Sequence, residues 1–122
     1  MRILYVEDNQ ELRETIAMLM EGPERVITTC DAGETALQLD APQPHDVLIT
    51  DVSLPGMSGT ELARTVLAQD PDRWVVLCTG YEFGSALAEL GKNVRSLTKP
   101  FELDDLENLL TEIDTALKTS PH

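Results

Sequence analysis

The sequence has few cysteines, few basic residues and no long apolar segment. Cys30 and Cys78 are its two cysteines, and both lie in apolar or β-branched stretches. We therefore expect two reduced, buried thiols rather than a disulfide or a metal site. No apolar run approaches the roughly 18–20 residues that cross a bilayer, and the N-terminus lacks the features of a secretory signal. These absences predict a cytoplasmic protein with no membrane insertion.

Basic residues are outnumbered, nine against 22 acidic ones, and the net charge is −13. A chain of this charge repels the phosphates of nucleic acids and anionic lipids, so direct binding of nucleic acid is not expected. What the sequence does contain is material for a core, because 42% of its 122 residues are hydrophobic. Its length and composition are those of one ordinary folded domain, spanning residues 1–122.

Apolar, β-branched segments alternate with segments of helical periodicity along the chain. Strands are predicted at residues 3–7, 25–29, 47–50, 74–79 and 94–98, and helices at 11–21, 33–39, from about 59, at 83–90 and at 103–117. Gly22 and Pro23 end the first helix, Asp31 could cap the second, and Ser58 with Glu61 forms a capping pair for the third. Five strands alternating with five helices predict an α/β fold, a doubly wound parallel sheet covered on both faces.

The first and last predicted helices carry apolar residues at helical spacing, which predicts their inner faces. These residues are Leu12, Ile16, Leu19 and Met20 in the first, and Leu103, Leu106, Leu109, Leu110, Ile113 and Leu117 in the last.

Polar side chains stand at the carboxyl ends of four predicted strands. Glu7 and Asp8 end the first strand, Asp51 the third, Thr79 the fourth and Lys99 the fifth. Ligands of doubly wound sheets bind beyond this edge, where these five side chains can meet. Three carboxylates repel one another unless a cation lies between them, and oxygen ligands of high charge suit Mg²⁺ or Mn²⁺. The sequence therefore predicts a divalent metal site.

This group of residues also fits phosphoryl transfer. A metal ion would screen the charge of a phosphoryl donor and orient Asp51 for in-line attack. The Thr79 hydroxyl and the Lys99 ammonium could then hold the phosphoryl oxygens. Each residue alone has a simpler interpretation, as a solvated loop acid, a turn residue, a strand threonine or a surface lysine. Their joint occurrence at the ends of four strands favours the phosphoryl site.

Four motifs resemble the CheY-like receiver domain of two-component response regulators and hybrid histidine kinases. They lie at residues 3–9, 48–59, 76–81 and 99–101, with the sequences ILYVEDN, LITDVSLPGMSG, VLCTGY and KPF. Because they are spread from end to end, the resemblance covers nearly the whole chain. It implies a flavodoxin-like, three-layer fold with strand order 2-1-3-4-5.

The resemblance also implies a function. Asp51 would accept a phosphoryl group from a histidine kinase or a histidine phosphotransfer protein, and Mg²⁺ would be bound by Glu7, Asp8, Asp51 and the backbone carbonyl of Ser53. The protein would then be a switch in a phosphorelay, catalysing only its own phosphorylation and dephosphorylation.

Further roles near the phosphoryl group follow from the same resemblance. Thr79 would move toward that group and Lys99 would bridge to it, with a cis peptide bond between Lys99 and Pro100. Gly80 would leave room for the phosphoryl group. The face formed by the fourth helix, fifth strand and last helix would contact partners or a second copy of the chain.

One position departs from the family pattern. Many members carry Tyr or Phe three residues before the lysine, where this chain has Ser96. A serine cannot fill an apolar pocket, so the usual aromatic readout of phosphorylation is not expected. Tyr81, two residues past Thr79, is either a substitute switch residue or a loop aromatic across the pocket mouth. Ser53 and Tyr81 should together tune the lifetime of the phosphate.

Three other functions fit parts of the pattern. An unphosphorylated docking module would be favoured by missing acids or a missing lysine, and Ser96 is the one feature that favours it. A hydrolase of the haloacid dehalogenase type needs a second acid two residues after its nucleophile, where this chain has Ser53. A flavodoxin-like binder needs a phosphate loop after the first strand, where Glu7 and Asp8 would repel phosphate. Whether the chain is a single-domain regulator or a piece of a hybrid kinase stays open.

Overall fold

The computed structural model describes residues 1–81 and 86–119. Strands and helices alternate along the chain. The strands are β1 (Arg2–Val6), β2 (Val26–Cys30), β3 (Val47–Asp51), β4 (Trp74–Thr79) and β5 (Val94–Thr98). The helices are α1 (Gln10–Met20), α2 (Gly33–Asp40), α3 (Gly59–Gln69), α4 (Ala86–Leu90) and α5 (Leu103–Thr119). Most elements agree with the prediction to within two residues, but the predicted start of α4 at residues 83–85 lies outside the described residues.

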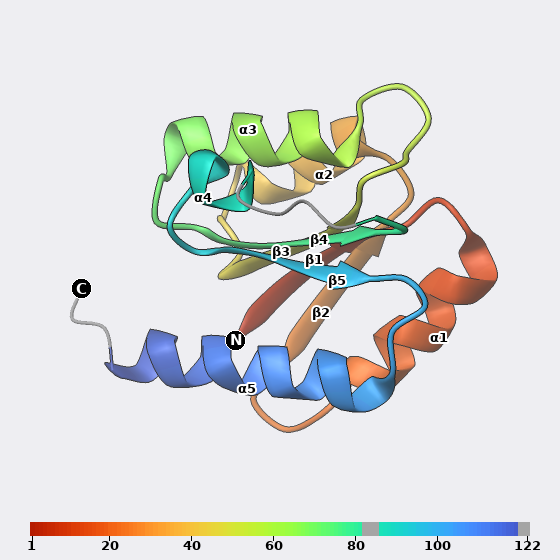
Figure 1. Cartoon of the computed structure of the whole chain (residues 1–122), viewed down its shortest axis with the longest axis vertical. Coiled ribbons are helices and arrows are strands. Elements are labelled where there is room, and N and C mark those ends of the chain that lie inside the picture. Colours follow the sequence, from red (N-terminus) through yellow and green to blue (C-terminus); the bar gives the residue numbers. More distant parts are fainter. Residues whose placement is uncertain (82–85, 120–122) are drawn as a thin grey trace.

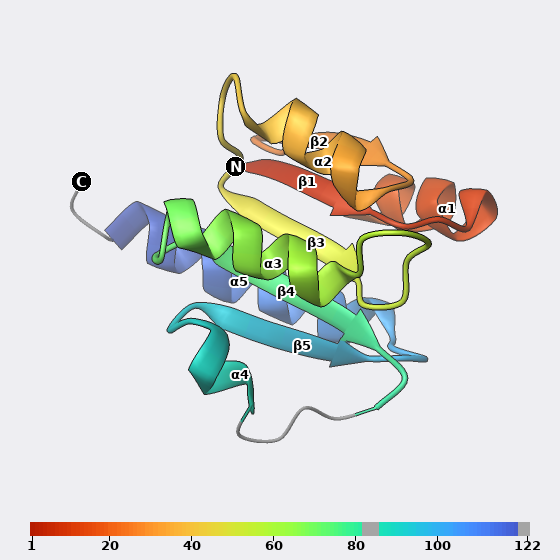
Figure 2. The same cartoon turned by 90° about the horizontal axis from the view of Figure 1, so that it is seen from above.

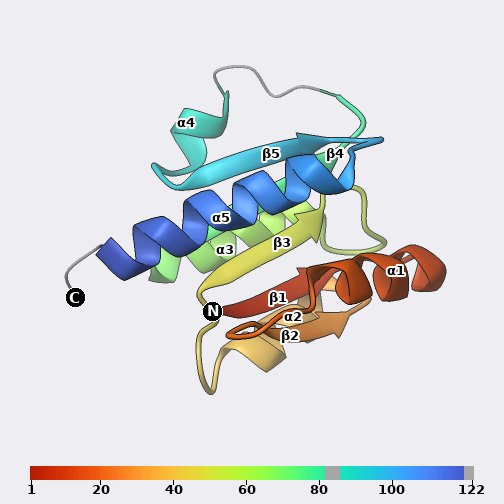
Figure 3. The same cartoon turned by 90° about the horizontal axis from the view of Figure 1, so that it is seen from below.

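The five strands form one parallel sheet in the order β2-β1-β3-β4-β5, which confirms the order implied by the resemblance. Helices α1 and α5 cover one face, and α2, α3 and α4 cover the other (Figures 1 and 2). All five strands run in the same direction, so their carboxyl ends lie along one edge (Figure 3). The order in which successive strands are added to the sheet reverses between β1 and β3, and ligands of such folds bind beside this switch point.

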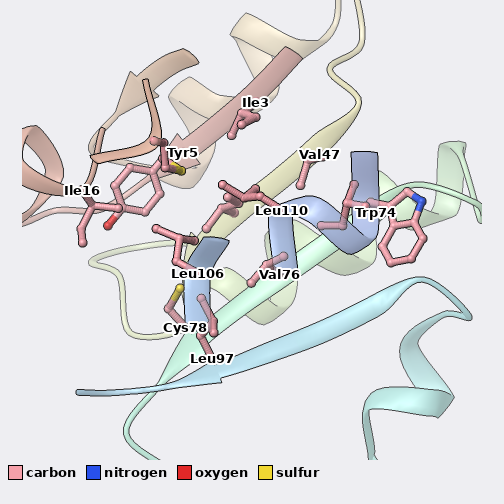
Figure 4. Close-up of a cluster of buried hydrophobic side chains, with 13 residues drawn as sticks. Ile3, Tyr5, Ile16, Val47, Trp74, Val76, Cys78, Leu97, Leu106 and Leu110 are labelled. Atoms are coloured by element: carbon pink, nitrogen blue, oxygen red, sulfur yellow. The ribbon is translucent and has the colours of Figure 1, made fainter. Parts of the chain in front are cut away.

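Two apolar clusters hold the helices on the sheet, one on each face. The cluster under α1 and α5 extends from Tyr5 and Ile16 at one end to Trp74 at the other (Figure 4). The second cluster packs β1, β3 and β4 against α2 and α3, with Leu87 and Leu90 of α4 at its margin. The three central strands are almost fully buried, and this rigid support fixes the positions of the side chains at their ends.

Cys30 and Cys78 are free and buried, which confirms the prediction for both. Burial raises the pKa of Cys30 and raises that of Cys78 to about 12, so both are thiols at neutral pH. No helix within residues 1–81 and 86–119 is long and apolar enough to cross a membrane.

The start of α3 was predicted correctly, whereas the cap of α2 was not. The Ser58 hydroxyl accepts the Glu61 N–H at 3.1 Å, as its position three residues earlier indicates. Helix α2 begins at Gly33 and its N-cap is Ala32, without a side-chain hydrogen bond. Asp31 lies one residue before the N-cap position, so the prediction that it could cap this helix was wrong.

The inner faces of α1 and α5 were predicted correctly except at their margins. Leu106, Leu110 and Ile113 are buried, as expected. Leu19 is 42% exposed and Leu103 is 45% exposed, so both predictions were wrong. At about 3.6 residues per turn, each lies roughly 60° from the centre of its apolar stripe, where the sheet no longer covers it.

Candidate metal and phosphoryl-transfer site

The three carboxylates predicted to bind a metal meet at the carboxyl edge of the sheet. β1 and β3 are neighbours in register, with Val6 opposite Thr50, so the residues that follow in each strand lie side by side. Each of Glu7, Asp8 and Asp51 offers an oxygen within 4.8 Å of the others. Glu7 is 2% exposed and Asp51 is also buried, while Asp8 is exposed. The site is therefore a pocket with two buried acids and one acid on its solvent side.

Lys99 is the cation of this pocket. Its Nζ lies 3.1 Å from Asp51 Oδ1 and 3.2 Å from Glu7 Oε1. The peptide bond between Lys99 and Pro100 is cis. Burial alone would lower the pKa of Lys99, but the hydrogen bonds to Asp51 and Glu7 outweigh it and raise that pKa. Among the described residues, this pocket therefore contains one lysine and three acids.

Glu7 is the most deeply buried of the three acids. Burial raises its pKa, against hydrogen bonds from the Asn9 N–H and Lys99 that favour the ionised form. A further contribution that raises the pKa comes from the neighbouring Asp8 carboxyl. A divalent cation in the pocket would remove this repulsion, and hard oxygen ligands are those that Mg²⁺ prefers.

The backbone of Glu7 is held as firmly as its side chain. Its N–H donates to the Cys30 carbonyl at 3.1 Å, and its own carbonyl accepts a hydrogen bond from Arg13 Nη1 at 2.8 Å. Asn9 caps α1 by accepting the Leu12 N–H at 3.0 Å. The sequence analysis did not single out Arg13. The feature of the sequence that could have drawn attention to it is that Arg13 is the single basic residue of α1, close after the acidic pair.

Thr79 ends β4 one residue beyond the strand partner of Asp51, and it is buried. Its hydroxyl accepts the Tyr81 N–H at 3.3 Å, and its carbonyl accepts the Lys99 N–H at 2.7 Å. The second bond joins the ends of β4 and β5, so the threonine and the lysine are positioned together. Among the atoms of residues 1–81 and 86–119, a Cβ at Gly80 would meet none within 4 Å.

Gly59 sets the distance between α3 and Asp51. A Cβ at this position would lie 2.0 Å from the Asp51 carbonyl oxygen, so only glycine fits. The Gly59 N–H donates to the Val52 carbonyl at 2.9 Å. Ser53 lies in the exposed loop between β3 and α3. The close approach at Gly59 thus determines the path of the loop that carries the Ser53 carbonyl.

The two candidate switch residues lie in different surroundings. Tyr81 is 57% exposed on the loop after β4. Ser96 is half-buried on the edge strand β5, opposite Leu77. A surface cavity of about 450 Å³ adjoins this serine, and its lining comes from β5, the loop after it and α5: Ser96, Leu97, Thr98, Phe101, Asp105, Asn108 and Leu109. The side chain at position 96 is too small to fill this space.

The matching family model describes the response regulator receiver domain, and it covers residues 3–111. The chain belongs to the response regulator receiver domain family. Receiver domains are the signalling switches of two-component systems. The order of the strands and the acids at the carboxyl edge therefore have a common explanation in this family.

Named relatives agree with this membership. The response regulator receiver protein CpdR of Brucella abortus (strain 2308) is 33% identical over 112 residues, which are 88% of this chain and 91% of that protein. The cell cycle response regulator CtrA of Brucella ovis is 28% identical over 114 residues, 87% of this chain and 47% of CtrA. The chain thus spans nearly the whole of CpdR and about half of CtrA.

Solved structures include the response regulator TrrA of Thermotoga maritima in complex with Mg²⁺-BeF. This chain is 28% identical to TrrA, with a TM-score of 0.80, and the match covers 92% of this chain and 97% of that one.

Proposed function

We propose that this receiver domain takes a phosphoryl group from a phosphohistidine onto Asp51, with Mg²⁺ as cofactor, and so switches its interactions with partners. The observation that carries the proposal is the pocket of three carboxylates within 4.8 Å, with a lysine ammonium 3.1 Å from the proposed acceptor. A hydrolase is disfavoured because Ser53 stands where its second acid would be. Membership of the receiver family supports the proposal.

The residues present fit a divalent cation. Glu7, Asp8 and Asp51 would hold it through carboxylate oxygens or intervening waters, and the backbone carbonyl of Ser53 would add a neutral oxygen ligand. Mn²⁺ has the same preference for oxygen and could replace Mg²⁺. When bound, the ion supplies positive charge that lets an anionic phosphoryl donor approach an acidic pocket. TrrA, which was solved with Mg²⁺-BeF, supports this choice of metal.

The chemistry on the chain's own residues is a displacement at phosphorus. A carboxylate oxygen of Asp51 forms the new P–O bond, and the P–N bond to the donor histidine breaks. Lys99 can bind a phosphoryl oxygen from its position beside Asp51, and Thr79 can turn its hydroxyl to another. Attack of water at phosphorus would later break the P–O bond to Asp51, which releases inorganic phosphate and restores the carboxylate. The chain would thus catalyse only its own modification and its reversal.

The proposed partners are a histidine kinase or a histidine phosphotransfer protein as donor, with a second copy of the chain as a candidate on the face of α4, β5 and α5. Readout differs from the usual family pattern, because Ser96 offers no ring to turn inward. Tyr81 is linked through its N–H to the Thr79 hydroxyl, which makes it the candidate for reporting movement of that threonine. The cytoplasmic location stays a prediction.

Intact mass after incubation with acetyl phosphate and Mg²⁺ tests the proposal. The native chain should gain one phosphoryl group, whereas Asp51→Asn should gain none. Asp104→Asn, an exposed acid at the start of α5, is the matched control and should behave like the native chain. A native chain that gains no mass with Mg²⁺ or Mn²⁺ would favour the docking module, and sustained hydrolysis of phosphate esters would favour the hydrolase.

A further inference from the structure

Arg13 contacts the candidate metal pocket through the backbone carbonyl of Glu7 and not through a carboxylate. Its guanidinium is half-buried on α1, and Nη1 donates to the Glu7 carbonyl at 2.8 Å. The strand β1 has ended at Val6, so this carbonyl has no place in the ladder of the sheet. Within the described parts of the chain, Arg13 is the hydrogen-bond donor that satisfies it. A buried carbonyl without a partner is unfavourable, so the contact stabilises the turn that follows β1.

Each polar group of Glu7 forms a hydrogen bond with a different partner. The N–H is bonded to β2 through Cys30, Oε2 accepts the Asn9 N–H at 3.3 Å, and Oε1 accepts Lys99 Nζ at 3.2 Å. The carbonyl is bonded to α1 through Arg13. Rotation about the Cα–C bond of Glu7 would move this carbonyl and the following Asp8 together. By holding the carbonyl, Arg13 restrains this rotation and with it the position of Asp8.

The charge of Arg13 and its hydrogen bond should act on a bound cation in opposite directions. Its positive charge lies close enough to favour the ionised forms of Tyr5 and Cys30, which flank the pocket. That charge repels a cation, so its removal alone would strengthen binding of Mg²⁺. The hydrogen bond orients the turn, so its removal would weaken binding of Mg²⁺. The sign of the change therefore separates the two roles.

We propose that Arg13 is a positioning residue that orients the Glu7–Asp8 turn for the metal ion, an inference that rests on the proposed function of the pocket. The orienting role outweighs the charge, because a charge-assisted hydrogen bond at 2.8 Å acts directly on the backbone, whereas the repulsion is screened at the half-exposed rim.

The test is a calorimetric titration of Mg²⁺ into the native chain, Arg13→Gln, Arg13→Lys and Arg64→Gln. Arg13→Gln should bind Mg²⁺ about tenfold more weakly, the usual effect of removing a residue that orients a metal ligand. Arg13→Lys keeps a charged donor and should recover part of the affinity. Arg64→Gln removes the same charge from an exposed site on α3 and should leave the affinity unchanged.

A second measurement needs no metal. In the metal-free chain, the Glu7 carbonyl carbon should show an NMR shift in Arg13→Gln that marks the lost hydrogen bond, and the Asp8 amide should exchange faster with solvent. Thermal unfolding of each variant checks that it is folded. If Arg13→Gln is not folded, the Mg²⁺ affinity of Arg13→Lys is compared with that of the native chain instead. Unchanged or tighter Mg²⁺ binding by Arg13→Gln would overturn the inference, as would a native chain that binds no Mg²⁺.

The inference and the proposed function can fail separately. If the native chain binds Mg²⁺ and Arg13→Gln binds it more weakly, yet acetyl phosphate modifies neither, Arg13 keeps its role and the phosphoryl acceptor is wrong. If the native chain is phosphorylated and Arg13→Gln binds Mg²⁺ as well as the native chain does, the proposed function stands and the role of Arg13 is wrong.

Discussion

The two ends of the sheet treat buried carboxylates in opposite ways. At the amino end, Asp40 is buried but fully paired: Arg73 donates to both of its oxygens at 3.1 and 3.2 Å, and the His45 N–H and ring add further bonds. These partners outweigh burial and lower the pKa of Asp40. At the carboxyl end, burial outweighs the partners of Glu7 and raises its pKa.

The difference separates a structural ion pair from a binding site. The amino-end network joins α2, the loop before β3 and the loop before β4, and the buried acid Asp40 is matched by a buried arginine. Arg73 also pairs with the more exposed Asp70 at 3.4 Å. The carboxyl-end pocket keeps three acids around one lysine, an arrangement that is unfavourable until a cation arrives. A raised pKa at Glu7, next to a deficit of positive charge, makes this end the candidate functional site.

The largest expected effect comes from breaking the paired end. Arg73→Met leaves Asp40 buried with the histidine alone, and it should lower the free energy of unfolding by about 3–5 kcal/mol. Urea denaturation measures this, with Arg64→Met as a surface control that should change little. Mg²⁺ affinity should be unaffected, because the two ends share no residue. A variant as stable as the native chain would show that the network is not structural.

Metal binding should stabilise the unpaired end by a comparable but smaller amount. At a Mg²⁺ concentration a hundred times its dissociation constant, the free energy of unfolding should rise by about 2.7 kcal/mol. Mg²⁺ should raise the free energy of unfolding of Arg73→Met by the same amount, although this variant is less stable without metal. It should raise that of Asp51→Asn only a little. Thermal melts with Mg²⁺ and with a chelator provide the measurement, and an equal response in Asp51→Asn would contradict the assigned ligands.

The two ends should also differ in their response to pH. In metal-free protein, Glu7 has a folded pKa above its ordinary value of 4.5, so its burial destabilises the chain at neutral pH and this penalty is relieved as pH falls toward 4.5. Asp40 has a folded pKa below its ordinary value of 3.8, so its contribution is present above 3.8 and is lost as pH falls further.

Urea denaturation at a series of pH values tests this contrast. Glu7→Gln should remove the part of the slope that lies above pH 4.5, and it should leave the loss of stability below 3.8 intact. A slope above pH 4.5 that is identical in Glu7→Gln and the native chain would show that Glu7 is not perturbed.

The smallest effect is expected at the exposed acid of the pocket. Asp8→Asn removes one charge from the solvent side, so it should raise the free energy of unfolding without metal by about 0.5 kcal/mol. It should also weaken Mg²⁺ binding. Paired urea titrations with and without Mg²⁺ resolve both changes. A variant that is destabilised without metal would mean that Asp8 does not repel its neighbours.

Much of the fold follows from short-range patterns. The β-branched runs, the helical spacing of leucines and the Ser58 cap each rest on local physics, and each corresponds to an observed element. The meeting of Glu7, Asp8, Asp51 and Lys99 at one edge was also predicted, because the end of a strand is visible in a sequence and parallel strands bring their ends together. Their roles in phosphoryl transfer stay a prediction. Leu19 and Leu103 were misplaced because periodicity does not say where the cover of the sheet stops.

Contacts between distant side chains were beyond the sequence. Nothing in the spacing of Asp40, His45 and Arg73 shows that three loops and helix ends would bring them together. Arg13 was missed for a related reason, since its partner is a backbone carbonyl and leaves no pattern of residue types. The acid and lysine positions can be predicted, whereas the residues that hold them in place cannot.

The central claim is that Asp51 carries the phosphoryl group. Borohydride reduces an acyl phosphate, which converts the modified aspartate to homoserine, and peptide mass spectrometry locates the product. After incubation with acetyl phosphate and Mg²⁺, homoserine should appear at position 51, and a chelator should prevent it. Homoserine at another aspartate, or none at position 51 in a chain that has gained phosphoryl mass, would contradict the account.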